Sequence, residues 1–267
     1  MAANHSLGTI YQLMQDFDGA RSFHERHEEI ASSVDVFEEV AKASVELYKV
    51  YMVIAESFEN LFSFDKALEM YEKCLDAGKR SWDRAAEGEA NGKIGNLLLA
   101  MGKTHECLPY LKQQSLIASD LGNAEGRCRA CSSLAYAYDT LGLADKALSE
   151  LSLVNSISEQ AGDAQLQAQA CKALGTLYSK VGKMDAAVDV LQKHFNLIKT
   201  ILHKSSASVD DQKVTKLSSK DLDIARLYIG ISKGNQLMGS YVLALQSDMS
   251  FLLDWKLHRS DNMSLSK

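Results

Sequence analysis

Two short clusters of the sequence contain residue types that could do chemistry. Cys128 and Cys131 form a C-x-x-C pair, a spacing that occurs in zinc and redox sites. Zinc needs two more ligands at a matching spacing, and none lies near this pair in the sequence. We therefore expect both residues to be small buried side chains. The odd total of five cysteines indicates reduced thiols in an intracellular compartment.

The second cluster is a histidine pair. His24 and His27 are three residues apart, whereas the metalloprotease motif H-E-x-x-H places two histidines four residues apart around a glutamate. We expect this pair on a solvated helix face. No Ser-His-Asp order or glycine-rich phosphate loop is present, so the sequence predicts no enzyme, no metal site and no cofactor. The other histidines are dispersed: His5, His105, His194, His203 and His258.

Composition and charge narrow the class of protein. The 267 residues are 46% hydrophobic and include one proline, which favours an all-α fold with a sizeable core. A net charge of -6 argues against a nucleic-acid partner, because a protein that binds the phosphate backbone needs a basic face. Neither a secretory signal nor an apolar run of about 18 residues is visible, so we expect a soluble cytoplasmic protein that binds no membrane.

Small residues recur at a fixed interval along the chain. From Ala67 to Ala187, the small residue that opens each second helix recurs at three successive intervals of 40 residues. The first interval is 47 residues and the last is 57, which indicates insertions near the two ends. The first five of these residues are each matched by a small residue in the preceding helix. The second helices contribute Ala20, Ala67, Cys107, Ala147, Ala187 and Ala244, and the first helices contribute Gly8, Ala55, Gly95, Ala135 and Gly175.

Helix crossing gives a physical reason for this pattern. Two antiparallel helices approach closely only where small side chains face each other, so Gly95 should meet Cys107 and Gly175 should meet Ala187. No helix pair can bury both of its faces alone, so stacking supplies the core. The sequence therefore predicts an all-α superhelix, a right-handed α-solenoid of about six hairpins. Larger residues fill the space between hairpins: Tyr71, Leu111, Leu151 and Leu191.

The predicted organisation is a single array over residues 1–267. Hairpins are expected at about 1–33, 34–82, 83–122, 123–162, 163–203 and 219–258, and the last of them contains two helices, 219–238 and 241–257. Turns are expected at Gly102, Gly122, Gly142, Gly162, Gly182 and Gly239. Residues 204–218 are an inserted segment, either a surface loop or a phosphorylated or partner-contacting stretch, and 259–267 form a tail.

The hairpins resemble the tetratricopeptide repeat in the 40-residue form of the Pins/LGN spindle-orientation proteins. The inter-repeat loop of that form resembles Gly162-Asp163-Ala164, and its second helix resembles the stretch from Tyr110 to Ile117-Ala118. The resemblance extends over nearly the whole chain. It implies a scaffold that binds other proteins and catalyses nothing, although a fold of this kind specifies function weakly.

The C-terminal end resembles a narrower family, the ciliary tetratricopeptide repeat protein 29 family. Residues 228–238 lead to a Leu-Leu-x-Trp-Lys phrase around Trp255, which closes the last hairpin in that family. This resemblance implies a structural or adaptor subunit of the axoneme of motile cilia or flagella, associated with dynein arms. Members have a long region ahead of the first repeat, whereas this sequence starts directly at a repeat. The terminal repeat of such an array needs a polar outer surface, so we expect a missing segment or another protein to cover the first hairpin. The apolar stripe of that hairpin is Leu7, Ile10 and Leu13.

The concave face of such an array is the expected partner-binding groove. Its residues come from the first helices, at fixed offsets from the aligned small residue. The N-terminal half is acidic, with Glu56, Glu59 and Glu89. The C-terminal half carries Arg129, Tyr136, Lys172, Thr176, Lys180, Arg226, Lys233 and Gln236. The alternative is that these exposed helix positions carry charges without any role in binding.

Three functions fit an array of this type. The first is the axonemal scaffold, as part of a hetero-complex with dynein-associated proteins. The second is a cytosolic peptide-binding adaptor of the spindle-orientation type. The third is a co-chaperone, which the sequence disfavours. The carboxylate clamp of co-chaperones needs an asparagine four residues after the lysine, and here Thr176 follows Lys172.

Charge reversal tests the basic half of the groove. We expect Lys172→Glu combined with Arg226→Glu to weaken binding of an acidic partner segment, because opposite charges steer and orient such a segment. The measurement is the dissociation constant of the complex. An unchanged affinity would contradict a role for these two residues.

Overall fold

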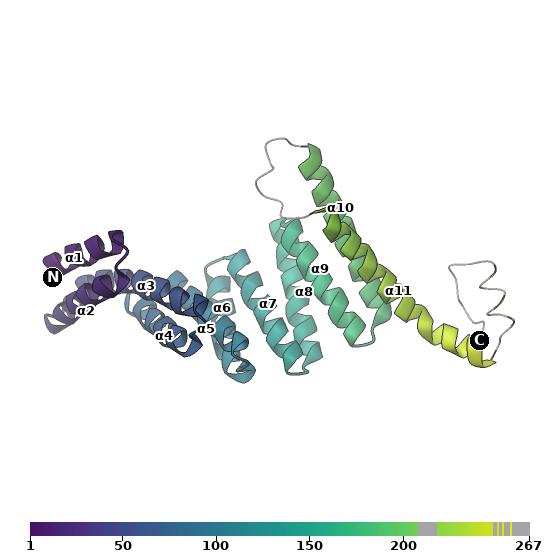
Figure 1. Ribbon diagram of the computed structural model, residues 1–267, viewed down its shortest axis with the longest axis horizontal. Coiled ribbons are helices and arrows are strands. Elements are labelled where there is room, and N and C mark those ends of the chain that lie inside the picture. Colours follow the sequence, from purple (N-terminus) through teal and green to yellow (C-terminus); the bar gives the residue numbers. More distant parts are fainter. Residues whose placement is uncertain (208–217, 248–249, 251–252, 254–256, 258–267) are drawn as a thin grey trace. The chain divides into compact units, whose positions relative to one another are not determined.

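The computed structural model describes residues 1–207 and 218–247, together with residues 250, 253 and 257. Every regular element in this part of the chain is an α-helix (Figure 1). None of the described helices has the length and hydropathy of a membrane-spanning helix. The helices are α1 Ala2–Leu13, α2 Phe17–Ser33, α3 Phe37–Asn60, α4 Phe64–Arg80, α5 Arg84–Ala100, α6 Thr104–Asp120, α7 Ala124–Thr140, α8 Ala144–Ala161, α9 Ala164–Lys180, α10 Met184–Ala207 and α11 Ser219–Ser247.

Two compact units make up the chain, and the division falls after α7. In unit 1, Met1–Leu143, each helix from α1 to α7 packs against the next one. In unit 2, Ala144–Lys267, the same holds from α8 to α11. Each helix pair is therefore stabilised mainly by its neighbours in the chain, as in a helical repeat. The prediction of an all-α repeat array is confirmed, whereas the hairpin boundaries stay a prediction.

The turns between helices share one backbone feature, a residue in the left-handed region. Gly102 has a φ of 76°, and the non-glycine residues Phe62 and Trp82 each have a φ of 57°. Five of the six glycines predicted at turns have this conformation, in which glycine meets no steric penalty from a Cβ atom. The full series at 20-residue spacing is Phe62, Trp82, Gly102, Gly122, Gly142, Gly162 and Gly182.

Neighbouring helices pack tightly where a glycine on one helix faces a side chain 16 residues later, on the next helix. A Cβ atom added at Gly95 would lie 2.6 Å from Leu111 Cδ2, and one added at Gly175 would lie 2.5 Å from Leu191 Cγ. Both leucines are buried. The nearest neighbour of each glycine is thus one helical turn beyond the small residue that the sequence indicated.

The other predicted packing residues are buried as well. Those within one unit are Gly8, Ala20, Ala55, Ala67, Cys107 and Ala187. Ala135 and Ala147 are buried too, but they belong to different units, so their pairing stays a prediction. Trp255 and the side chain of Ala244 lie outside the described part of the chain.

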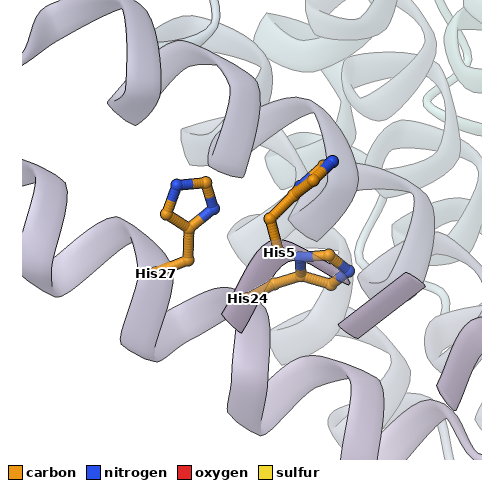
Figure 2. A group of neighbouring side chains, drawn as sticks. All are labelled: His5, His24 and His27. Atoms are coloured by element: carbon orange, nitrogen blue, oxygen red, sulfur yellow. The ribbon is translucent and has the colours of Figure 1, made fainter. Parts of the chain in front are cut away.

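The expectation of a solvated face for His24 and His27 is wrong. Their exposed fractions are 0% and 1%, and both rings lie beside His5 of α1 (Figure 2). The repeat explains this burial, because His24 follows Gly8 by 16 residues and so occupies the position of Leu111. A Cβ atom added at Gly8 would lie 2.5 Å from His24 Cε1. Helix α2 therefore places His24 where later repeats place larger, mainly apolar side chains.

The predicted turn at Gly239 is also wrong. Helix α11 runs from Ser219 to Ser247 and passes through this glycine without a break. Glycine costs a helix interior only about 1 kcal/mol relative to alanine, which neighbouring residues and packing can offset. The predicted insertion at 204–218 begins inside α10, which ends at Ala207. Most of that segment and the predicted tail at 259–267 lie outside the described residues.

Left-handed turn residues can be tested by exchanging glycine and non-glycine side chains. Gly102→Ala is expected to lower the free energy of unfolding by about 1 kcal/mol, because alanine is strained at positive φ. Trp82→Gly is expected to raise it by roughly 0.5–1 kcal/mol, because the indole is 87% exposed and loses little packing. Urea unfolding followed by circular dichroism measures both. A destabilised Trp82→Gly variant would contradict strain at this turn.

Candidate partner-binding groove

Unit 1 contains a groove with a volume of about 650 Å³. The first helices α3, α5 and α7 contribute most of its walls, and α6 contributes its floor. The residues that line it are Tyr48, Glu59, Asp83, Ala85, Ala86, Gly88, Glu89, Gly92, Lys93, Asn96, Gln114, Ile117, Ala118, Leu121, Asn123, Gly126 and Arg129.

Glycines on α5 let the α6 side chains reach the groove. A Cβ atom added at Gly88 would lie 2.9 Å from Ile117 Cγ2, and one added at Gly92 would overlap the amide group of Gln114. Both glycines are buried inside a helix, where glycine is otherwise unfavourable by about 1 kcal/mol. These glycines lower the helix propensity of α5, but they let α5 and α6 approach each other closely.

The floor of the groove contains an unpaired polar group. The side chain of Gln114 is 7% exposed, and its Oε1 atom has no hydrogen-bond partner among the described residues. A buried carbonyl oxygen without a partner costs about 1–3 kcal/mol. A group that donates a hydrogen bond from within the groove would remove this cost, so Gln114 is suited to receive an N–H or O–H donor.

Tyrosine hydroxyls hold two of the carboxylates that line the groove. Tyr48 donates to Glu89 at 2.8 Å, and Tyr71 donates to Glu59 at 2.6 Å. Burial first, and then the hydrogen bond to the neighbouring carboxylate, raises the pKa of both phenols above the usual value. The tyrosines therefore stay neutral hydrogen-bond donors.

Two cations lie among the lining residues, and each has an anionic partner. Lys93 contacts Glu56 at 2.7 Å and lies over the Tyr71 ring, 6.0 Å from its centroid. Arg129 contacts Glu125 at 2.9 Å. Both pairs are exposed or half-buried, and pairs of this kind contribute at most about 1 kcal/mol. Because both cations pair with glutamates outside the lining, they neutralise the three lining carboxylates only in part.

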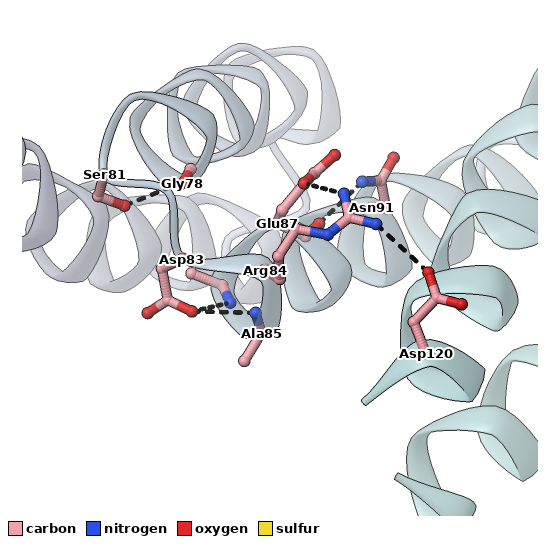
Figure 3. A network of polar contacts seen from close by, with 9 residues as sticks. Gly78, Ser81, Asp83, Arg84, Ala85, Glu87, Asn91 and Asp120 are labelled. Atoms are coloured by element: carbon pink, nitrogen blue, oxygen red, sulfur yellow. Dashed lines mark hydrogen bonds and ion pairs between the residues drawn. The ribbon is translucent and has the colours of Figure 1, made fainter. Parts of the chain in front are cut away.

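A polar network holds the start of α5 at the edge of the groove (Figure 3). Asp83 caps the helix, because its Oδ1 accepts the backbone N–H groups of Ala85 and Ala86 at 2.9 and 3.0 Å. Arg84 contacts Glu87 at 2.7 Å and Asp120 at the end of α6 at 3.6 Å. The groove wall is therefore fixed both within α5 and between α5 and α6.

The structure brings together part of the predicted groove. Glu59, Glu89 and Arg129 line it, and Glu56 lies beside it through Lys93. Tyr136 is 65% exposed on α7 and does not line this groove. A role in binding stays a prediction for all of these residues.

The predicted residues of unit 2 lie on α9 and α11. The ammonium group of Lys172 lies 5.3 Å from the centroid of the Tyr228 ring. Arg226 pairs with Asp223 at 2.8 Å. Gln236 donates to Asp185 at 2.6 Å. The remaining three are exposed: Thr176, Lys180 and Lys233.

Sequence reasoning missed the amide groups of the groove. Asn96, Gln114 and Asn123 line it, together with Tyr48. A signal existed for Gln114, which follows Cys74 by 40 residues and precedes Val154 by 40. The glutamine thus differs from the apolar residues of the two adjacent repeats, although His27 and His194 hold the same repeat position further away.

All five cysteines are buried and none forms a disulfide, in agreement with the expectation of small buried residues. Burial raises the pKa of Cys74 to about 12 and also raises those of Cys107 and Cys171. A thiol with a raised pKa is protonated at neutral pH and is a weak nucleophile and metal ligand.

Two segments of the chain match the tetratricopeptide repeat, residues 48–77 and residues 170–205. The first covers most of the α3–α4 pair, and the second covers most of the α9–α10 pair. A search of curated proteins found no match.

Several solved structures have a similar fold. The crystal structure of BtubC (BKLC) from P. vanneervenii matches with a TM-score of 0.60 and 16% identity, over 91% of this chain and 98% of that chain. Apo RapI matches at 0.61 and 15% identity, over 91% and 66%. MamA matches at 0.51 and 15% identity, over 81% and 97%. With the repeat matches, this likeness confirms the tetratricopeptide-type fold. It does not confirm the narrower resemblance to the Pins/LGN or ciliary proteins.

The unpaired oxygen of Gln114 predicts a stabilising substitution. Gln114→Met is expected to raise the free energy of unfolding by about 1 kcal/mol, because a flexible apolar side chain of similar size removes the unpaired carbonyl. Chemical unfolding at several denaturant concentrations measures the change. Gln113→Met is the matched control, since Gln113 does not line the groove and should show no comparable gain. A loss of stability at position 114 would show that its amide is already satisfied.

Proposed function

We propose that the chain is a non-enzymatic protein-binding scaffold and that the groove of unit 1 holds an extended segment of a partner. The observation that carries the proposal is the buried, unpaired Oε1 of Gln114 on the floor of a groove of about 650 Å³. The tetratricopeptide repeat supports it, because arrays of this type commonly bind other proteins and peptides.

An extended peptide backbone matches the polar groups of the groove. Side-chain amides both donate and accept hydrogen bonds, and so do the peptide groups of a bound segment. Asn96, Gln114 and Asn123 all line the groove. The small, exposed side chain of Ala85 leaves room for a main chain to approach closely. Gln114 would then accept a backbone N–H of the partner.

Charge favours a partner segment with a basic residue. The lining has three carboxylates, Glu59, Asp83 and Glu89, and two cations, Lys93 and Arg129. Both cations already contact a glutamate outside the lining. A lysine or arginine of the partner would therefore meet an acidic wall, whereas an acidic segment would be repelled there. This preference concerns unit 1 alone.

The proposal can be tested with unstructured peptides displayed as a random library and selected on the full chain. Enriched peptides should carry a basic residue and should compete with one another for one site. Gln114→Met and Glu89→Lys should each weaken their binding by about tenfold, the effect of losing roughly 1.4 kcal/mol. Gln113→Met should bind normally. If Gln114→Met gains stability and keeps full affinity, the groove of unit 1 is not the binding site.

The cellular setting is a second part of the proposal. A structural or adaptor role in the axoneme of motile cilia, beside dynein arms, is supported by the resemblance of residues 228–256 to the ciliary family. A spindle-orientation adaptor is the alternative, and a co-chaperone is a weaker one. A tagged copy should appear in the axoneme, at the cell cortex or throughout the cytosol, respectively. Retention on axonemes after washing with detergent and salt would favour the first setting.

A further inference from the structure

Three histidines meet at the first helix pair of unit 1, away from the groove. His5 belongs to α1, and His24 and His27 belong to α2. Each can offer a ring nitrogen within 4.8 Å of those of the other two. The centroid of the His5 ring lies 5.9 Å from that of His24 and 5.6 Å from that of His27 (Figure 2).

The local sequence explains why the rings converge. His24 and His27 are three residues apart on one helix, so they project from the same face of α2. Gly8 of α1 faces the His24 ring, where any larger side chain would overlap it. His5 lies one helical turn before Gly8 and is half-buried, which leaves the cluster accessible from one side.

Four nitrogen atoms of this cluster are buried and have no hydrogen-bond partner among the described residues. They are His5 Nδ1, His24 Nδ1, His24 Nε2 and His27 Nδ1. A buried polar atom without a partner costs about 1–3 kcal/mol and needs an explanation, such as an ion. Edge-to-face ring packing alone leaves all four atoms unsatisfied. An ion among the rings would satisfy three of them at once.

A carboxylate outside the cluster orients one ring. His27 Nε2 lies 3.1 Å from Glu39 Oε2 of α3. Glu39 is an acceptor, so this contact places the ring proton on Nε2 and leaves the lone pair of Nδ1 free. A carboxylate bound to the far nitrogen of a histidine is the usual outer partner of a metal-binding imidazole.

We propose that His5, His24 and His27 form a binding site for a divalent transition-metal ion, with Zn²⁺ as the best match. Imidazole nitrogens suit zinc, nickel and copper, and three such ligands leave one position of a tetrahedral zinc ion for water. Tetrahedral zinc with bonds of about 2.1 Å places its ligands about 3.4 Å apart, so the rings close slightly around the ion. The ion links α1 to α2 and stabilises the first helix pair.

Metal titration of the full chain tests this site directly. The protein is freed of any histidine tag and of bound metal, and Zn²⁺ is added with calorimetric detection. We expect one Zn²⁺ per chain, a higher melting temperature with Zn²⁺ than with Mg²⁺, and the visible absorption of tetrahedral Co²⁺ when cobalt replaces zinc. Failure to bind one equivalent of Zn²⁺, or octahedral Co²⁺, would overturn the proposal.

Four variants assign the ligands. His5→Ala and His24→Leu should abolish the cobalt spectrum, and His24→Leu should remain folded because Leu111 occupies the same repeat position. Glu39→Gln should keep the stoichiometry and weaken Zn²⁺ binding by about 10- to 100-fold. His105→Ala, an exposed histidine on α6, should bind as the parent chain does. Unchanged binding by folded His5→Ala would overturn the site, and so would loss of binding by His105→Ala.

Discussion

Close approach between neighbouring helices is the constraint on which the rest of the structure depends. A small residue on one helix lets a larger side chain, 16 residues later, pack against its backbone. Where α5 meets α6, close approach at other glycines also shapes the groove, because Gly88 faces Ile117 and Gly92 faces Gln114. Glycines on α5 therefore serve both the core packing and the floor of the groove. The pairs are Gly8 with His24, Gly95 with Leu111 and Gly175 with Leu191.

The regular part of the fold could be predicted because each repeat carries its own local signals. Glycine at Gly102 and at its equivalents marks positive φ, and Asp83 or Asn123 marks the next helix start. These signals depend on a few neighbouring residues. The turn predicted at Gly239 failed because a lone glycine does not by itself end a helix. Phe62 and Trp82 show the reverse, since the chain turns there without any glycine.

The candidate site was only partly predictable, and the reason is geometric. The fixed offsets from the aligned small residue of each first helix identified the charged residues Glu59, Glu89 and Arg129, which do line the groove. Gln114 comes from a second helix, and its exposure to the groove depends on glycines in another helix. The prediction for the histidines failed for a related reason. Their polar side chains suggested exposure to solvent, although the repeat position of His24 is one that larger apolar residues fill elsewhere in the chain.

The left-handed turn at Trp82 has a practical consequence for anyone who follows this protein in solution. Trp82 is the one tryptophan within the described residues, and it is 87% exposed in the folded chain. Its indole is already surrounded by water, so its emission should resemble that of an unfolded peptide before any denaturant is added. Fluorescence would then understate the loss of unit 1. Far-ultraviolet signals from the helical backbone would report the same event fully.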